Sequence, residues 1–358
     1  MTNAIEHFSR HRVDNTTLQV MADTQLDLAR LVDEEQAVIR QYAHAGRWPH
    51  RRVNLFVLED LKPLVSQIKN VSAMSSVVAD DIDRRPMVNV YDAADLTECA
   101  VFVNRSALEE DGVWRDGVAL RALLAHEHGH PLAENATVHA ARALSVDLAI
   151  GDGASTKGAA QVLHLLADRL CLHAPQEVFA NETAIRAGFG DALFHLDSGV
   201  VEKARLGVAA RASLVRRLDE QTRDGELTAE RAAALLLVGD LQAHLPLALE
   251  TAPFFRAGHL QQGEALEAAL FRGVLTDLDA AAMRLYEEFR DHYLRLREDF
   301  TPAEMRTWAA DALGFLAHAL EASNLPVQFE LVQPGSAKAK RRQSRPGRAA
   351  VNHDGRLP

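Results

Sequence analysis

The sequence predicts an α+β fold with a small sheet, one central helix and a large helical C-terminal region. Three observations support this class. A strongly helical segment covers residues 116–130. From about Val200 onward, apolar residues recur at helical spacing for most of the remaining chain. β-rich runs lie close together in the first third of the chain and recur once near its end, at 53–58, 87–91, 100–104 and 327–332.

The N-terminal third is expected to contain a helix before the sheet. Residues 16–45 place apolar side chains among many charges, so residues 1–50 are interpreted as a helical N-terminal segment. VNLFVL at 53–58 is expected to be a buried strand, followed by a short helix over 63–71. Two further strands, MVNVY and AVFVN, are expected after it, separated by a polar stretch.

The middle of the chain is expected to be helical. Residues 116–130 form the central helix, and 136–150 and 156–172 form a helical hairpin after it. Pro175 opens a further helix, which Gly188 is expected to end.

The rest of the chain divides into a helical region and a basic tail. Residues 198–333 are expected to form a helical C-terminal region, in which Thr301 and Glu304 make a capping box at the start of one helix. Residues 334–358 hold almost no large apolar side chains, so this tail is expected to be disordered.

Composition favours a globular protein of a reducing compartment. The chain has 358 residues, of which 47% are hydrophobic, and this excludes a fully disordered protein. Cys99 and Cys171 are expected to be buried small side chains, because two cysteines without a CxxC pair make neither a disulfide framework nor a clear metal motif. The N-terminus lacks the apolar segment of a signal peptide. Runs such as Ala232–Gly239 fall short of the roughly 20 residues that span a bilayer, so a cytoplasmic protein is expected.

The charge balance argues against broad nucleic-acid binding. The net charge is -11, and the segment from Gly335 onward carries seven basic residues and one acidic residue, which leaves -17 on the preceding residues. Phosphates would be repelled by this acidic body. The tail could contact nucleic acid or an acidic partner through its basic cluster, Lys338, Lys340, Arg341 and Arg342. Basic runs more often only solubilise a chain.

One segment, AHEHGH at 125–130, combines residues that could carry chemistry. It contains H-E-x-x-H inside the predicted helix. Because helical residues turn by about 100° each, His126 and His130 share one face, Glu127 lies at its flank and His128 points nearly opposite. Two imidazoles one turn apart suit zinc, and Glu127 is then placed as general base towards a metal-bound water. This spacing is typical of zinc peptidases.

The third zinc ligand is expected within PQEVFANETAIRAG, residues 175–188. Glu177 and Asn181 share a helical face, so Glu177 could bind the metal while Asn181 accepts a hydrogen bond from a ligand histidine. Glu182 is the alternative ligand, but Arg186 four residues later favours a surface ion pair for it. No His-x-x-Gly-x-x-His spacing is present, which excludes the metzincin arrangement.

Two segments resemble those of a known peptidase family. AVFVNRSALEEDGVWRDGVALRALLAHEHGH is similar to the strand, loop and helix that lead to the active site of HtpX-like and Oma-like gluzincins. EVFANETAIRAGF resembles their second segment, in which Glu-x-x-Ala-Asp carries the third ligand. The resemblance covers about residues 86–196. It implies a zincin core over 51–197, with a small twisted sheet against the active-site helix, one zinc ion on His126, His130 and Glu177, and Glu127 as base.

This sequence departs from that family in two ways. Asn181 stands where the family usually has Asp, which would weaken the polarisation of the ligand histidine, and Glu-x-x-Ala-Asn also resembles the ImmA/IrrE type of soluble metallopeptidase. HtpX-like proteins are embedded in membranes, whereas residues 136–172 here carry several charges. A soluble relative is therefore expected.

Together these features predict a zinc-dependent peptidase acting on a peptide or protein substrate. Two alternatives stay open: a regulatory or binding protein that keeps the site without useful turnover, and a helical scaffold with a chance H-E-x-x-H. A peptidase also needs a donor for the developing oxyanion. His173, Arg186 and His195 lie near the second motif, and His195 is placed plausibly, although a structural role is commoner for such a histidine.

Overall fold

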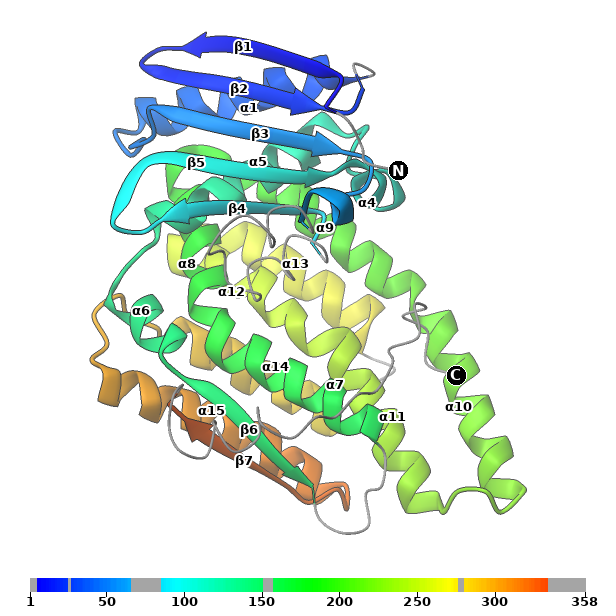
Figure 1. The fold of residues 1–358 in the computed structure, drawn as a ribbon. Helices are drawn as coiled ribbons and strands as arrows, with labels where there is room; N and C mark the ends of the chain where they lie inside the picture. Colours follow the sequence, from blue (N-terminus) through cyan, green and yellow to red (C-terminus); the bar gives the residue numbers. More distant parts are fainter. Residues whose placement is uncertain (1–4, 25–26, 66–84, 151–156, 276–279, 334–358) are drawn as a thin grey trace.

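The computed structural model describes residues 5–24, 27–65, 85–150, 157–275 and 280–333, and it has an α+β architecture (Figure 1). A five-stranded mixed sheet lies at one end, helices fill the middle, and a two-stranded sheet lies at the opposite end. The strands are β1 (His7–Val13), β2 (Thr16–Ala22), β3 (Arg52–Leu58), β4 (Met87–Asp92), β5 (Asp95–Asn104), β6 (Ser145–Ile150) and β7 (Val327–Val332). The α-helices are α1 (Leu28–His44), α4 (Arg105–Glu110), α5 (Gly117–Leu132), α6 (Ala136–Arg142), α7 (Lys157–Asp168), α8 (Ala174–Ala184), α9 (Gly190–Leu206), α10 (Val208–Arg223), α11 (Ala229–His244), α12 (Ala248–Ala257), α13 (Leu260–Gly273), α14 (Ala280–Leu294) and α15 (Pro302–Ala322).

The large sheet has the strand order β1-β2-β3-β5-β4. Its outer pairs are antiparallel and its two inner pairs are parallel. The strands predicted over 53–58, 87–91 and 100–104 are confirmed as β3, β4 and β5. Helices α1 and α5 lie behind this sheet in Figure 1, and the buried side chains Leu55 and Val101 belong to the main hydrophobic core. The sheet therefore supports α5, the helix that carries the motif.

The helical N-terminal segment predicted for residues 1–50 is wrong in its first half. Residues 7–22 form the β1–β2 hairpin, and only α1, which begins at Leu28, is helical. In β2, Leu18 and Val20 are buried while their neighbours are partly exposed, which is the period of a strand. Over seven residues this pattern overlaps with a helical one, and the parallel pairing of β2 with β3 decides between them.

The helical hairpin predicted over 136–172 is also wrong in part. α6 ends at Arg142, and Ser145–Ile150 forms β6, which pairs antiparallel with β7. Ser145 pairs with Val332, a partner so far along the chain that local periodicity does not reveal it. The second helix is confirmed as α7, and β7 confirms the strand predicted over 327–332.

Two predictions fall wholly or partly outside the described residues. Of the short helix predicted over 63–71, residues 62–65 are helical and residues 66–71 lie outside the described part. The tail at 334–358 also lies outside it.

The C-terminal region is helical, as predicted, and shares its core with the sheet. One continuous cluster of buried hydrophobic residues extends from the five-stranded sheet to α14 and α15. The boundary expected between residues 197 and 198 falls inside α9. The capping box is confirmed: Glu304 N donates to the Thr301 side chain, and Thr301 N donates to the Glu304 carboxylate.

Within the described residues, one helical stretch, Ala229–Ala257, is long and apolar enough to cross a membrane by length and composition. It is longer than the apolar run Ala232–Gly239 noted in the sequence. Inside the molecule, 61% of its most apolar window is buried. Core helices pass the same test, so the stretch is weak evidence for a membrane span.

Candidate metal centre

Helix α5 presents the two histidines of the motif on one face. The Asp116 side chain caps the start of the helix, which ends at Leu132, directly after Pro131. The rings of His126 and His130 lie edge to face with their centroids 4.6 Å apart. Their Nε2 atoms are 3.1 Å apart. The helical spacing therefore brings two nitrogen atoms to one point, as predicted.

Helix α8 adds the carboxylate of Glu177. Glu177 Oε2 lies 3.2 Å from His126 Nε2 and 3.9 Å from His130 Nε2. Tetrahedral bonds of about 2.0–2.1 Å to zinc place neighbouring ligand atoms roughly 3.3 Å apart. These two nitrogens and one oxygen therefore fit a single zinc ion and leave a fourth position open. The structure thus brings together the three residues expected as ligands.

A glycine allows α8 to approach α5 this closely. A Cβ atom added to Gly129 would lie 2.5 Å from the carbonyl oxygen of Ala180. No side chain fits at that distance unless one helix moves. Gly129 lies between His126 and His130 in the sequence, so the glycine of HEHGH sets how near Glu177 comes to the two imidazoles.

The outer ring nitrogens of both histidines have polar partners. His126 Nδ1 lies 2.6 Å from Asn181 Oδ1, which accepts the ring hydrogen when Nε2 faces a metal. His130 Nδ1 lies 3.3 Å from the Gln176 amide. Arg85 donates to Glu177 Oε1 at 3.3 Å. The Asn181 contact is the one expected from its spacing, and it is made although Asn replaces the Asp of the resembling family.

Glu127 is almost fully buried beside the ligand group. Its Oε2 accepts a hydrogen bond of 2.9 Å from the backbone N–H of Asn89 in strand β4. The Asn89 side chain also donates to the backbone oxygen of Glu127, at 3.1 Å. Burial raises the pKa of Glu127 above its usual range. A general base works best when its pKa lies near the operating pH, so this shift suits proton transfer.

Without a metal, the two motif histidines differ in how readily they take up a proton. Although burial opposes charge on His126, the hydrogen bond and charge of Glu177 raise its pKa to about 9. Burial and the charge of His126 lower the pKa of His130 to about 3. Although burial opposes it, the His126 hydrogen bond holds the pKa of Glu177 well below its usual range. The metal-free site therefore favours a protonated His126 paired with an ionised Glu177, whose facing atoms are 3.2 Å apart.

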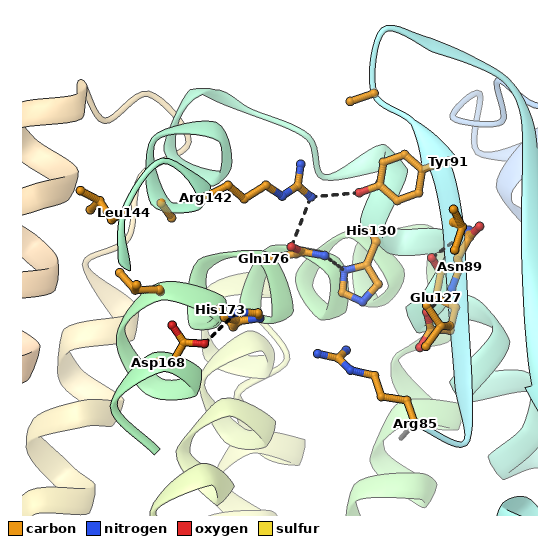
Figure 2. Close-up of a pocket in the computed structure, with 15 residues that line it drawn as sticks. Arg85, Asn89, Tyr91, Glu127, His130, Arg142, Leu144, Asp168, His173 and Gln176 are labelled. Atoms are coloured by element: carbon orange, nitrogen blue, oxygen red, sulfur yellow. Dashed lines mark hydrogen bonds and ion pairs between the residues drawn. The ribbon is translucent and has the colours of Figure 1, made fainter. Parts of the chain in front are cut away.

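Two cavities adjoin the ligand group. The first, of about 410 Å³, is lined by Glu127 and His130 together with the polar side chains shown in Figure 2. The second, of about 480 Å³, is lined by His126 and Glu177 together with the buried carboxyl of Asp197. The candidate metal ligands are therefore shared between the walls of both cavities.

The alternative ligand and the candidate oxyanion donors named from the sequence lie away from the ligand group and its two cavities, with one exception. Glu182 does not join the ligand group, because its oxygens accept from Arg186 at 2.6 Å and from Arg256 at 2.8 Å. The expected ion pair with Arg186 is confirmed, although Glu182 itself is buried. His195 pairs with Asp116 at 2.6 Å and lines neither cavity. Of the three residues weighed as oxyanion donors, only His173 lines the first cavity, where it lies beside Asp168.

Sequence reasoning missed the polar residues of the first cavity. Arg142 donates to the Tyr91 hydroxyl and to Gln176 Oε1, both at 3.2 Å, and Tyr91 donates to Glu134. Figure 2 shows Arg142, Tyr91 and Gln176 converging beside His130. One signal in the sequence could have pointed to this cavity: Asn89 is a polar residue inside an apolar strand. Its partner Glu127 lies on another element, so the sequence does not show that the two residues meet.

Comparisons with family models, with curated proteins and with solved structures find no match for this chain. The interpretation of the site therefore depends on its own residues and geometry.

Proposed function

We propose that this protein is a zinc-dependent peptidase. The observation that carries the proposal is the convergence of His126, His130 and Glu177, whose facing atoms lie 3.1–3.9 Å apart, with Glu127 buried beside them. Two imidazoles and one carboxylate with an open fourth position are the ligand set of catalytic zinc in peptidases. Zinc bound there would bring the pKa of a water molecule near neutrality and polarise a carbonyl group.

Glu127 is proposed as the general base and acid. Asn89 holds Glu127 Oε2, which fixes the carboxylate and leaves Oε1 to exchange a proton. Glu127 would take a proton from the attacking water and give it to the leaving amine. Because its pKa is raised by burial, the group can serve in both directions.

The sheet edge next to Glu127 favours an extended peptide as substrate. β4 is the last strand of the sheet and pairs on one side with β5. Residues 88–91 of this strand line the first cavity. An extended chain can add to such an edge through main-chain hydrogen bonds. This supports a peptide rather than a small ester.

His173 is the best placed candidate to stabilise a developing oxyanion. It lines the first cavity together with Glu127 and His130. The hydrogen bond that His173 donates to Asp168 raises the pKa of His173, so the ring holds its proton more firmly than a free imidazole. A protonated imidazole beside the reacting group would stabilise the negative charge that develops there.

The test is hydrolysis of a fluorescently labelled unfolded protein by zinc-loaded wild type and by Glu127→Gln. The variant should keep its zinc and lose activity by about 10²-fold or more, as expected for a lost general base. Glu110→Gln is the matched control, because Glu110 is an exposed glutamate at the end of α4. It should cleave like wild type.

Two outcomes would contradict the proposal. Equal cleavage by wild type and Glu127→Gln would show that the activity does not come from this site. Zinc-loaded wild type that cleaves neither the unfolded protein nor a mixed peptide library would instead favour a zincin-like binding protein without turnover.

A further inference from the structure

A second group of potential metal ligands lies inside the molecule, behind the motif helix. His50, Cys99 and His128 each offer one ligand atom, and these atoms all lie within 4.8 Å of one another. All three side chains are buried, with exposures of 2%, 3% and 0%. None of them belongs to the ligand set of the proposed peptidase site. They come from the residues before β3, from β5 and from α5.

Each imidazole in this group already uses one ring nitrogen. His50 Nδ1 lies 2.5 Å from the carbonyl oxygen of Leu96, so this nitrogen carries the hydrogen. His128 Nε2 lies 2.8 Å from Glu35 Oε1, a carboxylate that is fully buried on α1. Metal-binding histidines usually donate their second ring nitrogen to a carbonyl or a carboxylate in this way. His50 Nε2 then keeps an unpartnered lone pair, and His128 Nδ1 has only a long contact of 3.4 Å with the Asn89 amide.

The group also lacks donors for its acceptor atoms. His50 Nε2 is buried and has no hydrogen-bond partner among the described residues. The same holds for Glu35 Oε2 and Asn89 Oδ1, and the side chains of both residues are within hydrogen-bond distance of the His128 ring. Buried polar atoms are nearly always paired, so three orphaned acceptors around one ring indicate an occupant with positive charge.

We propose that His50, Cys99 and His128 bind a second, structural cation of the zinc class. Two imidazole nitrogens and one sulfur suit a borderline-soft divalent ion. Binding would replace the S–H bond of Cys99 by a sulfur–metal bond and release the proton to solvent. A divalent ion, the Cys99 thiolate and the Glu35 carboxylate then sum to zero charge, which a dry interior requires. A monovalent ion would leave one negative charge uncompensated.

Such an ion would join four elements around the motif. It would tie β5 and the residues before β3 to α5, with α1 attached through Glu35. Asn89 connects this group to the proposed peptidase site, because it contacts His128 and also donates to Glu127. The second cation would therefore fix the position of the general base without contacting substrate.

Cobalt distinguishes the two sites, because only the second one contains sulfur. The full chain is expressed in cobalt-supplemented medium, so that no exchange through a closed core is needed. Wild type should bind two cobalt ions per chain and show a thiolate-to-cobalt charge-transfer band. His126→Ala should keep the band and lose one cobalt, which separates this proposal from the peptidase proposal.

The two cysteines of the chain provide matched variants. Cys99→Ser should lose the band and one cobalt, whereas Cys171→Ser, also buried, should keep both. If Cys99→Ser does not fold, a band that persists in Cys171→Ser still assigns the sulfur to Cys99. Folded wild type without the band would overturn the proposal and leave a buried Glu35–His128 ion pair with no cation. A band that is lost in Cys171→Ser would overturn it as well.

Discussion

At the scale of single residues, the proposed peptidase site depends on how its ligands are held. The imidazole of His126 is oriented by Asn181 at 2.6 Å, and the carboxylate of Glu127 by Asn89 at 2.9 Å. Neither asparagine is proposed to contact the metal. Asn181 restricts the rotation of His126, a proposed metal ligand, and Asn89 restricts that of Glu127, the proposed general base beside the metal.

Replacing Asn181 should weaken zinc binding. Loss of a partner that orients a ligand histidine typically reduces metal affinity by about 10–100-fold. Asn181→Ala should therefore show this loss in a competition titration with a chromogenic chelator. Asn181→Asp is the matched control and should bind zinc at least as tightly as wild type, because the carboxylate accepts the same hydrogen bond. Equal affinity in wild type and Asn181→Ala would refute the orienting role.

A buried acid beside the site should make the metal-free protein less stable as the pH rises. Burial and the charge of Glu250 raise the pKa of Asp197 well above its usual value. The folded chain then binds more protons than the unfolded chain, so stability falls between the unfolded and the folded pKa. Asp197→Asn should flatten this decline and raise the free energy of unfolding near neutral pH. Urea unfolding at several pH values from about 5 to 8 measures this free energy. If it falls with pH as steeply in Asp197→Asn as in wild type, Asp197 is not the group responsible.

At the scale of elements, the site is made by the crossing of α5 and α8. His126 and His130 come from one helix and Glu177 from the other, and no local pattern fixes the distance between them. That distance is set where Gly129 meets the backbone of Ala180. The helix crossing is therefore as necessary to the site as the motif itself.

Adding one methyl group at this crossing should disturb both packing and metal binding. In Gly129→Ala the new Cβ would lie 2.5 Å from Ala180 O, so the helices must separate. Overpacking of this kind costs about 1–3 kcal/mol, and zinc affinity should fall as Glu177 moves away. Gly314→Ala in α15 is the control, since nothing lies within 4 Å of its added Cβ. Thermal unfolding that is no lower for Gly129→Ala than for Gly314→Ala would show that the contact does not matter.

The difference between patterns within one element and contacts between elements explains what could be predicted from the sequence. His126 and His130 were found because their i, i+4 spacing lies within one helix, and Glu177 because Asn181 lies one turn beyond it. The prediction of helix is wrong for β2 and β6, because β2 also pairs with β3 and β6 pairs with β7, and both of these partners are distant in sequence. Tyr91, Arg142 and the His50–Cys99–His128 group were missed for the same reason. Their side chains meet only after β4, β5, α5 and α6 have packed together.

At the scale of the whole molecule, the sheet and the C-terminal helices share one hydrophobic core. The proposed peptidase site lies where the motif helix, supported by the sheet, meets the helical bundle. A cation there would connect α5 to α8. Its removal should therefore loosen those two helices more than distant ones.

Hydrogen exchange with and without a chelator tests this. Amides of α8 should exchange faster in the metal-free protein, because the Glu177 bond to the cation no longer restrains that helix. Amides of α15, which contributes no ligand to either group, should change less. An equal change in α8 and α15 would indicate general destabilisation instead.

The most direct test of the peptidase proposal is the zinc content of purified Glu177→Gln and Glu182→Gln. Both changes remove one carboxylate from α8 and keep the shape of the side chain, but only Glu177 faces the two imidazoles. Elemental analysis should find one zinc per chain fewer in Glu177→Gln than in wild type, and no loss in Glu182→Gln. If Glu177→Gln retains all the zinc of wild type, the proposed ligand set is wrong.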